Sequence, residues 1–459
     1  MRLNDTIAAI ATPVGTGGIG ITRVSGPGSE EIGSLLFRPE KNACRFKTHR
    51  LYHGDIVSPQ TNTVLDEVLI TLMREPHSYT GEDVLEINCH GGPVILQAIL
   101  NEVIKAGARL AEPGEFTKRA FLNNRLDLSQ AEAVADMITA GTDRGLRLAV
   151  AQLKGNLSEK IRDIRSAVVD ILAILETSID FPEDDTGISL AHELAGRIQS
   201  IIGDGMELLS TYHQGKIYRD GASAVITGKT NVGKSSLLNR LLGEKRAIVT
   251  HIPGTTRDFI EETINIKGAP VRFTDTAGIR DAGNSIEKAG IELVWEKIST
   301  ADAVIIVLDG SEKLTWEDHE IIKRNRCGNC LLIINKSDLP HILNVTELYD
   351  LLPGVKPLWI SARYGEGISA LKERIYSSIS GNTDNNRSEI MITNLRHRIA
   401  LERTVSLLSS AGENILKDIS PEFVSLDLRE SLESLGEIVG ETINEDVLDR
   451  IFSNFCIGK

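Results

Sequence analysis

The stretch G-K-T-N-V-G-K-S at residues 228–235 constrains the fold of this chain more than any other. It follows a strand-like run, A-S-A-V-I-T, and precedes a helical run, S-S-L-L-N-R-L-L, which is the setting that a phosphate-binding loop requires. Its glycines let backbone amides turn toward phosphates, Lys234 supplies charge to the β- and γ-phosphates, and the Ser235 hydroxyl ligates Mg²⁺. The stretch therefore predicts a nucleotide site where a strand meets a helix.

The segment around this loop alternates between strand-like and helical runs from residue 222 to about residue 380. This alternation predicts a mostly parallel sheet with helices on both faces. The strand-like runs are A-S-A-V-I-T, V-R-F-T-D, A-V-I-I-V-L, L-L-I-I-N and P-L-W-I-S. Polar segments at 213–221 and 380–388 border the unit, and we interpret both as linkers.

Three further motifs follow in the order of a GTP-binding domain. D-T-A-G ends a strand, which directs Asp275 toward the metal and the Gly278 amide toward the γ-phosphate. N-K-S-D ends another, and Asp338 there can accept both N1–H and N2–H of guanine, whereas adenine has no such donor pair. ATP would leave this carboxylate unpaired, at a cost of about 1–3 kcal/mol or more. S-A-R at 361–363 ends a third strand and would brace the base.

The predicted GTP contacts come from these motifs and from the loop around residue 252. They are Gly228, Asn231, Val232, Gly233, Lys234, Ser235, Ser236, Thr250, His251, Ile252, Pro253, Gly254, Thr255, Thr256, Asp275, Thr276, Ala277, Gly278, Asn335, Lys336, Asp338, Ser361 and Ala362.

The machinery for hydrolysis departs from that of Ras-type GTPases, which place a Gln directly after D-x-x-G to orient the attacking water. Ile279 stands at that position and cannot orient water. Oxygens of the Thr-rich segment 247–258 and of Asn231 can instead hold a monovalent cation beside the phosphates. Arg257 as an arginine finger is the alternative source of charge. Glu287 is the best carboxylate to act as base or to orient water, and is otherwise an exposed charge at a helix N-terminus.

Helical periodicity flanks the α/β unit on both sides. Apolar residues recur at spacings of three and four from Ile161 to Leu175 and again from Leu428 to Val439. The first 118 residues instead show short strand-like runs broken by Gly and Pro, with one helix near 93–106. The predicted fold class is multidomain α+β and α/β, with an N-terminal α/β module, an all-helical middle domain and an inserted Ras-like P-loop domain. The predicted domains are 1–118, 119–215 together with 384–459, and 217–380.

Composition and charge narrow the function classes. A hydrophobic fraction of 41% and a charged fraction of 25% are those of an ordinary soluble globular protein. The net charge of −14 argues against nucleic-acid binding over the whole surface, so such a substrate would need a local basic patch or a basic partner. Five cysteines favour a reducing cytoplasm over a disulfide framework. The N-terminus lacks a signal-peptide pattern and the apolar runs are too short for a membrane span, so we expect a cytoplasmic protein.

The phosphate loop, the stretch G-T-T-R-D and the terminal F-C-I-G-K together resemble the MnmE (TrmE) family of bacterial tRNA-modification GTPases, over essentially the whole chain. The resemblance implies K⁺-stimulated GTP hydrolysis through pairing of GTPase domains in a homodimer. It also implies a flavoprotein partner, MnmG (GidA), and a carboxymethylaminomethyl or aminomethyl group placed at C5 of the wobble uridine (U34) of tRNA. By position, it implies Glu287 as catalytic acid, Mg²⁺ ligands Ser235 and Thr256, and K⁺ ligands Asn231, Thr250, Ile252 and Thr255.

The N-terminal module is similar to tetrahydrofolate-binding one-carbon proteins. The matching stretches are T-P-V-G-T-G-G-I-G-I-T-R-V-S-G, T-G-E-D-V-L-E and R-A-F-L-N-N-R-L-D-L. The resemblance implies a folate-binding-like fold that carries 5-formyl- or 5,10-methylene-tetrahydrofolate, and implies that the family dimerises here. The implied folate contacts are Arg23, Glu86, Arg125 and Lys459. A carboxylate matches the paired N–H donors of a pterin ring, and basic groups suit the glutamate tail; without the resemblance, Arg23 and Glu86 fit ordinary solvated strand charges equally well.

The thiol of Cys456, three residues from the last residue, has two interpretations. If the C-terminal helix docks the tail beside the folate pocket, the thiol can act as a nucleophile or redox group, provided that its pKa is depressed. Otherwise it packs as a small apolar residue. Two rival functions remain open: a regulatory GTPase of ribosome or RNA-complex assembly, and a folate-dependent transferase that merely carries a GTPase regulator.

Overall fold

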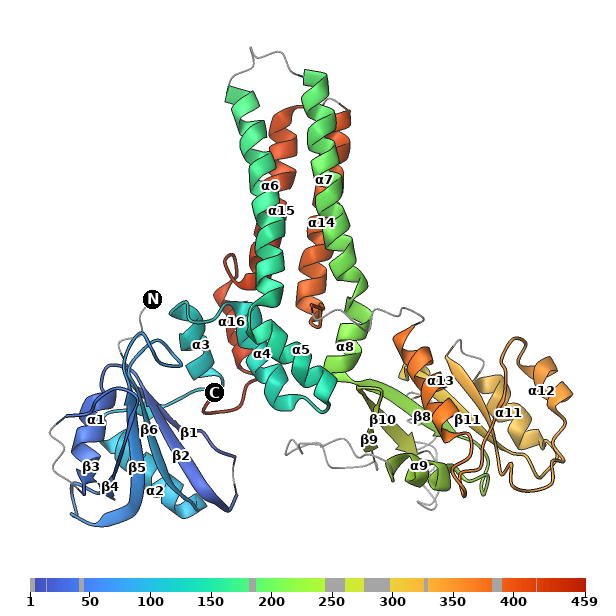
Figure 1. Cartoon of the computed structure of the whole chain (residues 1–459), viewed down its shortest axis with the longest axis horizontal. Coiled ribbons are helices and arrows are strands. Elements are labelled where there is room, and N and C mark those ends of the chain that lie inside the picture. Colours follow the sequence, from blue (N-terminus) through green and yellow to red (C-terminus); the bar gives the residue numbers. More distant parts are fainter. Residues whose placement is uncertain are drawn as a thin grey trace. The chain divides into compact units, whose positions relative to one another are not determined.

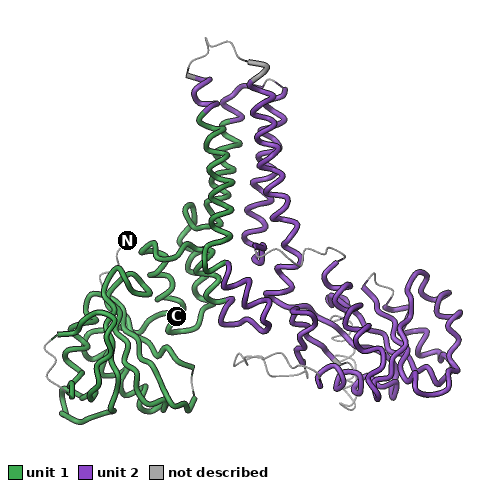
Figure 2. The backbone as a smooth tube through the Cα atoms, in the orientation of Figure 1, with its two compact units in different colours: residues 1–135, 152–173, 425–459 green, residues 136–151, 174–424 purple. Residues whose placement is uncertain are grey.

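The computed structural model describes residues 5–13, 15–40, 45–180, 187–243, 261–275, 298–325, 329–381, 390–417 and 419–459. The chain forms two compact units (Figure 2). The first comprises residues 1–135, 152–173 and 425–459, and the second comprises residues 136–151 and 174–424.

The first unit contains a seven-stranded sheet with the strand order β3-β4-β5-β6-β2-β1-β7 (Figure 1). Neighbouring strands are antiparallel except β1 and β7, which are parallel. Alternate residues such as Ile70 and Leu72 are buried, because one face of the sheet packs against helices α1 and α2. The helix predicted near 93–106 is α2, which begins with Pro93 in its first turn. The bounds are β1 Ile7–Ile10, β2 Gly17–Ser25, α1 Ser29–Leu36, β3 Phe37–Pro39, β4 Arg50–Val57, β5 Val64–Met73, β6 Val84–Gly91, α2 Pro93–Lys105 and β7 Arg109–Leu110.

Three helices bring the end of the chain onto this unit: α3 (Glu115–Leu122), α4 (Leu128–Thr139) and α16 (Glu445–Phe452). Gly114 precedes α3 with a left-handed φ of 68°. A Cβ on Gly114 would lie only 2.5 Å from the carbonyl oxygen of Phe452, so glycine is required where α16 meets α3. An apolar cluster that includes Phe452 and Phe455 buries this contact.

The second unit contains a six-stranded sheet with the order β13-β12-β11-β8-β10-β9. All pairs are parallel except β10 with β9. Two apolar clusters take alternate residues of the strands, with Ile305 and Val307 on one face and Ile306 and Leu308 on the other, so helices cover both faces. The bounds are β8 Ala222–Thr227, α9 Lys234–Leu242, β9 Glu261–Ile266, β10 Ala269–Asp275, β11 Ala303–Asp309, α11 Trp316–Arg324, β12 Cys330–Asn335, α12 Val345–Leu351, β13 Leu358–Trp359 and α13 Ile368–Ser380.

Long helices flank this sheet in the sequence. Helices α7 and α14 lie side by side (Figure 1), and a Cβ on Gly205 would lie 2.9 Å from a methyl carbon of Val405, so glycine permits the close approach. The apolar periodicities of 161–175 and 428–439 fall within helices α6 and α15, as predicted. The bounds are α5 Asp143–Leu153, α6 Asn156–Asp180, α7 Gly187–Ser210, α14 Leu395–Leu416 and α15 Pro421–Val439.

The interpretation of 213–221 as a linker is wrong, because Tyr212–Asp220 form helix α8. The segment is too short and too polar for its own sequence to predict a helix. Tertiary packing stabilises it instead, since Ile217 and Tyr218 are buried in the core of the second unit. The helix ends at Gly221, whose φ is 80°.

The predicted fold class is confirmed: an α/β N-terminal module, helical segments, and a mainly parallel sheet with helices on both faces. The division into three domains stays a prediction. Among the residues described, no helix is both long enough and apolar enough to traverse a lipid bilayer.

Candidate functional site

The phosphate loop joins β8 to α9, as predicted. Gly228 and Gly233 have φ values of 153° and 97°, and Asn231 is also left-handed at 65°. A Cβ on Gly233 would lie 2.3 Å from Nδ2 of Asn335, and one on Gly228 would lie 2.4 Å from a β11 carbonyl oxygen. Both glycines are therefore required by close contacts as well as by backbone conformation.

Lys234 is buried in the first turn of α9, and its Nζ donates to the carbonyl oxygens of Gly228 and Lys229 at 2.9 and 2.7 Å. The ammonium thus lies within the curve of the loop, where a phosphate-binding lysine is needed. The side chain of Lys229 pairs with Glu312 at 2.9 Å and Asp318 at 3.5 Å, which links the loop to the start of α11.

The predicted base-binding residues converge on the loop. Asn335 accepts a hydrogen bond from the Ala362 amide at 3.0 Å and donates to the Val232 carbonyl oxygen at 2.8 Å. The buried Ser361 hydroxyl donates to Oδ1 of Asp338 at 2.6 Å. Asp338 itself is exposed, so its carboxylate is oriented by this hydrogen bond and still remains open to a ligand.

A cavity of about 330 Å³ lies beside this arrangement. Two predicted contacts line it, Ser236 from α9 and Ala362 from the segment after β13. The two motifs that are 126 positions apart in the sequence, at 236 and 362, therefore face the same space.

Asp309 is a residue of this site that the sequence interpretation missed. It ends β11, is buried, and pairs through Oδ2 with Nζ of Lys336 at 2.5 Å. Burial opposes its ionisation, but hydrogen bonds from Lys336 and Ser311 outweigh burial and hold the pKa of Asp309 below its ordinary value. Its position at the carboxyl end of a parallel strand, like that of Asp275, is the signal that could have identified it.

Asp275 is described as the last residue of β10, where it pairs in register with Ile226 of β8. The remaining predicted residues of this site lie outside the part of the chain that the structure describes. They are Thr250, His251, Ile252, Pro253, Gly254, Thr255, Thr256, Arg257, Thr276, Ala277, Gly278, Ile279 and Glu287.

The predicted folate residues lie on the N-terminal sheet. Arg23 and Glu86 stand directly opposite each other on β2 and β6, and Arg23 Nε and Nη2 lie 2.9 and 2.8 Å from Glu86 Oε1. The guanidinium lies 5.6 Å from the ring centroid of Tyr79 and 5.8 Å from that of Phe116. Both groups keep about a fifth of their side-chain surface exposed, 18% and 21%, so a ligand can still reach them.

The C-terminal tail docks at the same place. Nη1 of Arg23 donates to the carbonyl oxygen of Gly458 at 3.2 Å. Gly458 has a φ of 91°, and a Cβ there would lie 2.5 Å from the carbonyl oxygen of Ile10. The Gly114 amide donates to the Cys456 carbonyl oxygen at 3.4 Å, while the Cys456 side chain is exposed. The tail is therefore held by the Arg23 side chain of β2 and by the Gly114 amide, and Gly458 lies close to the β1 backbone at Ile10.

Arg125 and Lys459 lie at the margin of this group. Nε of Arg125 donates to the Ser78 carbonyl oxygen at 3.1 Å, next to Tyr79 in the chain. The Lys459 amide donates to the Cys456 carbonyl oxygen at 3.3 Å, and the residue is half-buried. The structure thus places Arg23 in contact with both Glu86 and the tail. Arg125 instead contacts Ser78, the residue that precedes Tyr79 in the chain.

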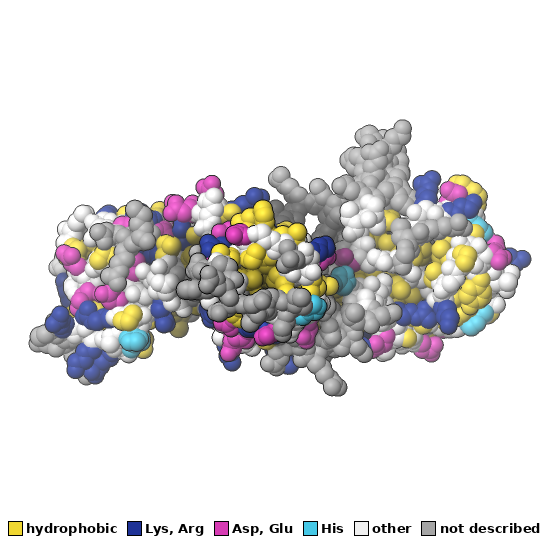
Figure 3. Space-filling model, turned by 90° about the horizontal axis from the view of Figure 1, so that it is seen from above, with side chains coloured by type: hydrophobic (Ala, Val, Ile, Leu, Met, Phe, Trp, Pro, Cys, Tyr) yellow, Lys and Arg dark blue, Asp and Glu magenta, His cyan; other side chains and the backbone are white. Residues whose placement is uncertain are grey.

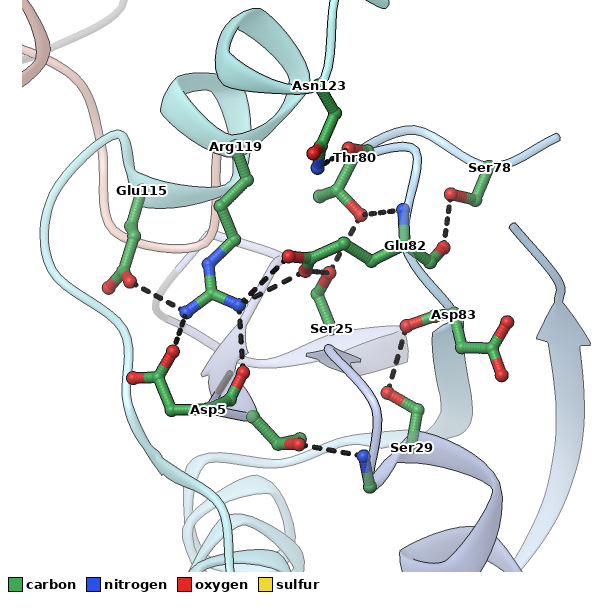
Figure 4. A network of polar contacts seen from close by, with 12 residues as sticks. Asp5, Ser25, Ser29, Ser78, Thr80, Glu82, Asp83, Glu115, Arg119 and Asn123 are labelled. Atoms are coloured by element: carbon green, nitrogen blue, oxygen red, sulfur yellow. Dashed lines mark hydrogen bonds and ion pairs between the residues drawn. The ribbon is translucent and has the colours of Figure 1, made fainter. Parts of the chain in front are cut away.

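An ionic network centred on the buried Arg119 lies in the same unit (Figure 4). The Arg119 guanidinium is 1% exposed and lies 2.7 Å from Asp5, 3.1 Å from Glu82 and 3.1 Å from Glu115. Glu82 also accepts from the Ser25 hydroxyl at 2.8 Å. Because Glu82 belongs to T-G-E-D-V-L-E, the network holds the start of that stretch against α3.

Comparison with known proteins assigns the chain to a family. Residues 6–125 match the family model described as GTP-binding protein TrmE N-terminus, and residues 128–456 match that of the MnmE helical domain. The chain belongs to the MnmE family. The tRNA modification GTPase MnmE of Syntrophus aciditrophicus is 54% identical over 457 residues, which cover 100% of each chain. That of Natranaerobius thermophilus is 47% identical, with 99% of each chain covered.

Two ring side chains are the features that the resemblance to MnmE did not reveal. Tyr79 and Phe116 flank Arg23 although they lie 56 and 93 positions from it in the sequence. No local pattern marks either residue, because their proximity arises only when the segment after β5 and helix α3 fold onto β2.

Proposed function

We propose that this MnmE-family GTPase couples GTP hydrolysis to modification of the wobble uridine at C5. The observation that carries the nucleotide assignment is the pairing of the Ser361 hydroxyl with the exposed Asp338 carboxylate, beside a loop that already holds Lys234 in place. Such a carboxylate satisfies the two adjacent N–H donors of guanine and leaves ATP without a matching pair.

The metal ligands are proposed on the family resemblance and on the described half of the site. Ser235 stands in the first turn of α9, and with Thr256 it would hold Mg²⁺. Asn231 would hold K⁺ together with Thr250, Ile252 and Thr255. An amide oxygen and backbone oxygens suit a hard monovalent cation, which would supply positive charge for the phosphate oxygens. Glu287 is proposed as catalytic acid.

The N-terminal site is proposed to hold a tetrahydrofolate derivative, which supplies a one-carbon unit when bound. The residues present fit such a ligand, because the Glu86 carboxylate remains accessible and can accept paired N–H donors, and the half-buried ring of Tyr79 lies beside Arg23. Arg23, Arg125 and Lys459 would bind its carboxylates.

Cys456 is proposed as a catalytic thiol of the modification reaction. Its exposed side chain supports this role, since the Gly114 amide holds the Cys456 backbone two residues before the Gly458 carbonyl oxygen that Arg23 contacts. Replacement of Cys456 by Ser is then expected to abolish tRNA modification while leaving GTP hydrolysis intact, and normal modification would make the thiol structural.

The proposed partners are a second copy of this chain, the flavoprotein MnmG (GidA) and tRNA, in the cytoplasm. The described surface in Figure 3 carries basic and acidic side chains intermixed, in line with the net charge of −14. This distribution supports delivery of tRNA by a local patch or by the partner rather than by the whole surface. The proposed domains remain 1–118, 119–215 with 384–459, and 217–380.

The decisive experiment is mass analysis of wobble uridines in tRNA from cells that lack this protein, with and without rescue by the parent gene. We expect the C5 substituent to disappear and to return on rescue. An unchanged modification profile together with defective ribosome particles would instead favour the assembly-factor function.

A further inference from the structure

The β9–β10 hairpin connects two segments that are predicted to contact the nucleotide. β9 begins at Glu261, shortly after the Thr-rich segment 247–258, and β10 ends at Asp275, the first residue of D-T-A-G. β10 also pairs with β8, which leads into the phosphate loop. The ends of the hairpin are therefore continuous in sequence with both segments, and β10 joins the hairpin to the strand that leads into that loop.

The turn of this hairpin has an unusual composition. Lys267 and Gly268 both have positive φ, 54° and 92°, as in a two-residue turn that normally takes Asn-Gly. A lysine in the first position is conformationally unfavourable, so the contacts of its side chain must compensate for the backbone strain. Its Nζ pairs with Glu373 and lies 5.5 Å from the ring centroid of Tyr376, and both partners belong to α13.

The outer side of the turn contacts two helices that lie outside the α/β sheet in the sequence. A Cβ on Gly268 would lie 3.0 Å from Cβ of Arg144 on α5 and 3.8 Å from the ring of Tyr218 on α8. A Cβ on Gly221, directly after α8, would lie 2.7 Å from the carbonyl oxygen of Pro270. The hairpin backbone thus packs directly against the side chains of Arg144 and Tyr218, and at Pro270 against the backbone of Gly221.

Side-chain contacts also connect α5, α8 and α13 to one another. The Tyr218 hydroxyl lies 2.8 Å from that of Tyr376, and the Arg144 guanidinium lies 5.6 Å from the Tyr218 ring centroid. Tyr218 is 2% exposed. Burial raises the pKa of Tyr218 far above its ordinary value, so the phenol stays neutral and its hydrogen bond with Tyr376 persists at neutral pH.

We infer that Arg144 and Tyr218 are positioning residues for GTP hydrolysis: through them α5 and α8 hold the β9–β10 hairpin and set where its two ends stand relative to the phosphate loop. This inference rests on the proposed GTPase site. By thermodynamic linkage the contact works in both directions, so a nucleotide that shifts the hairpin also shifts α5 and α8. Neither residue is expected to touch the nucleotide.

The test is steady-state GTP hydrolysis by the full chain carrying Arg144→Met and Tyr218→Phe together. We expect kcat to fall about five-fold or more, with KM and GDP affinity changed less than about two-fold, because positioning rather than nucleotide binding is lost. Arg144→Lys alone keeps a cation near the Tyr218 ring, so we expect this variant to retain most of the kcat of the parent. Arg147→Met, at an exposed position of the same helix, is the matched control and should leave kcat unchanged.

A second readout is amide hydrogen exchange of α5 and α8 with and without a non-hydrolysable GTP analogue. Nucleotide-dependent exchange in the parent and its loss in the double variant are expected. If the double variant unfolds at a lower temperature than the assay allows, Tyr376→Phe is used in its place, because it removes the hydroxyl on α13 that contacts Tyr218. The inference is overturned if kcat of the folded variant stays within about two-fold of the parent, or if exchange in the parent is insensitive to nucleotide. A parent that does not hydrolyse GTP would instead overturn the proposed function.

Discussion

Asp338 and Arg119 are charged residues with opposite environments. Asp338 is exposed, and a hydrogen bond from the Ser361 hydroxyl orients its carboxylate. Arg119 is buried, and three carboxylates surround its guanidinium. An exposed but oriented charge is suited to a ligand, whereas a buried charge must be compensated by the protein itself. The first residue is therefore expected to control specificity and the second to control stability.

Asp338→Asn is expected to weaken GTP binding about ten- to hundred-fold, because the amide replaces one acceptor by a donor and loses a charged hydrogen bond. The same amide can donate to the carbonyl at position 2 of xanthine, so affinity for xanthosine triphosphate should rise. Competition against fluorescent GDP measures both affinities. Asp350→Asn, on the exposed side of α12, is the control, and equal losses in both variants would contradict the specificity role.

Glu115 predicts how stability depends on pH. Burial raises the pKa of Glu115, but hydrogen bonds from Arg109, from the Glu112 amide and from Arg119 outweigh burial and hold the pKa below the ordinary 4.5. A lowered folded pKa means that this stabilisation is complete above the ordinary value and is lost as the pH falls through the folded one. Urea unfolding between pH 7 and pH 3 should show that loss of stability.

Glu115→Gln is expected to lower the free energy of unfolding by about 2 kcal/mol at neutral pH and to flatten this pH dependence. Glu31→Gln, at an exposed position of α1, should leave both unchanged. If the Glu115→Gln protein lost stability at low pH as the parent does, other carboxylates would be responsible for the pH dependence.

At the scale of elements, the C-terminal tail shows how a short segment becomes part of a site. Helix α16 packs on α3 at Gly114, and the tail beyond it reaches Arg23 through the Gly458 carbonyl oxygen. The sequence suggested this docking only as one of two interpretations of Cys456. The positive φ of Gly458 and its close contact with Ile10 explain why the tail can lie against β1.

Gly458→Ala is expected to displace the tail, because Cβ would strain the backbone and meet the Ile10 carbonyl oxygen. Loss of one hydrogen bond to a charged group should weaken binding of 5-formyl-tetrahydrofolate about ten-fold, while GTP hydrolysis stays at the parent rate. Fluorescence titration measures the first and phosphate release the second. Ile457→Ala, where the side chain is 61% exposed, is the control; unchanged folate affinity in Gly458→Ala would separate the tail from the site.

On the scale of the whole molecule, the candidate nucleotide site and the candidate folate site belong to different compact units. The nucleotide site has Ile279, not Gln, directly after D-T-A-G, so hydrolysis needs another way to stabilise the charge on the phosphates. An arginine finger contributes about 10³–10⁵ in rate. A K⁺ ion held by Asn231 and the Thr-rich segment would replace part of that charge, and pairing of two chains would complete its surroundings.

Hydrolysis in K⁺ buffer is therefore expected to exceed that in Na⁺ buffer of equal ionic strength by about ten-fold or more, a small part of what a finger supplies. Asn231→Gly keeps the left-handed backbone of the loop, φ 65°, but removes the amide oxygen, so it should bind GTP and lose the K⁺ effect. Phosphate release by both proteins in both salts provides the measurement. Equal turnover of the parent in the two salts would rule out the cation and return Arg257 to consideration.

The sequence by itself determined the parallel sheet and the phosphate loop and predicted the guanine-reading motif, because each depends on local spacing and on residues at strand ends. It also placed the helices at 93–106, 161–175 and 428–439, where apolar periodicity is long enough to be read. Only the tertiary structure decided that Tyr212–Asp220 form a helix and that Tyr79, Phe116 and Gly458 surround Arg23. Those features depend on contacts between residues far apart in the chain, which local patterns do not encode.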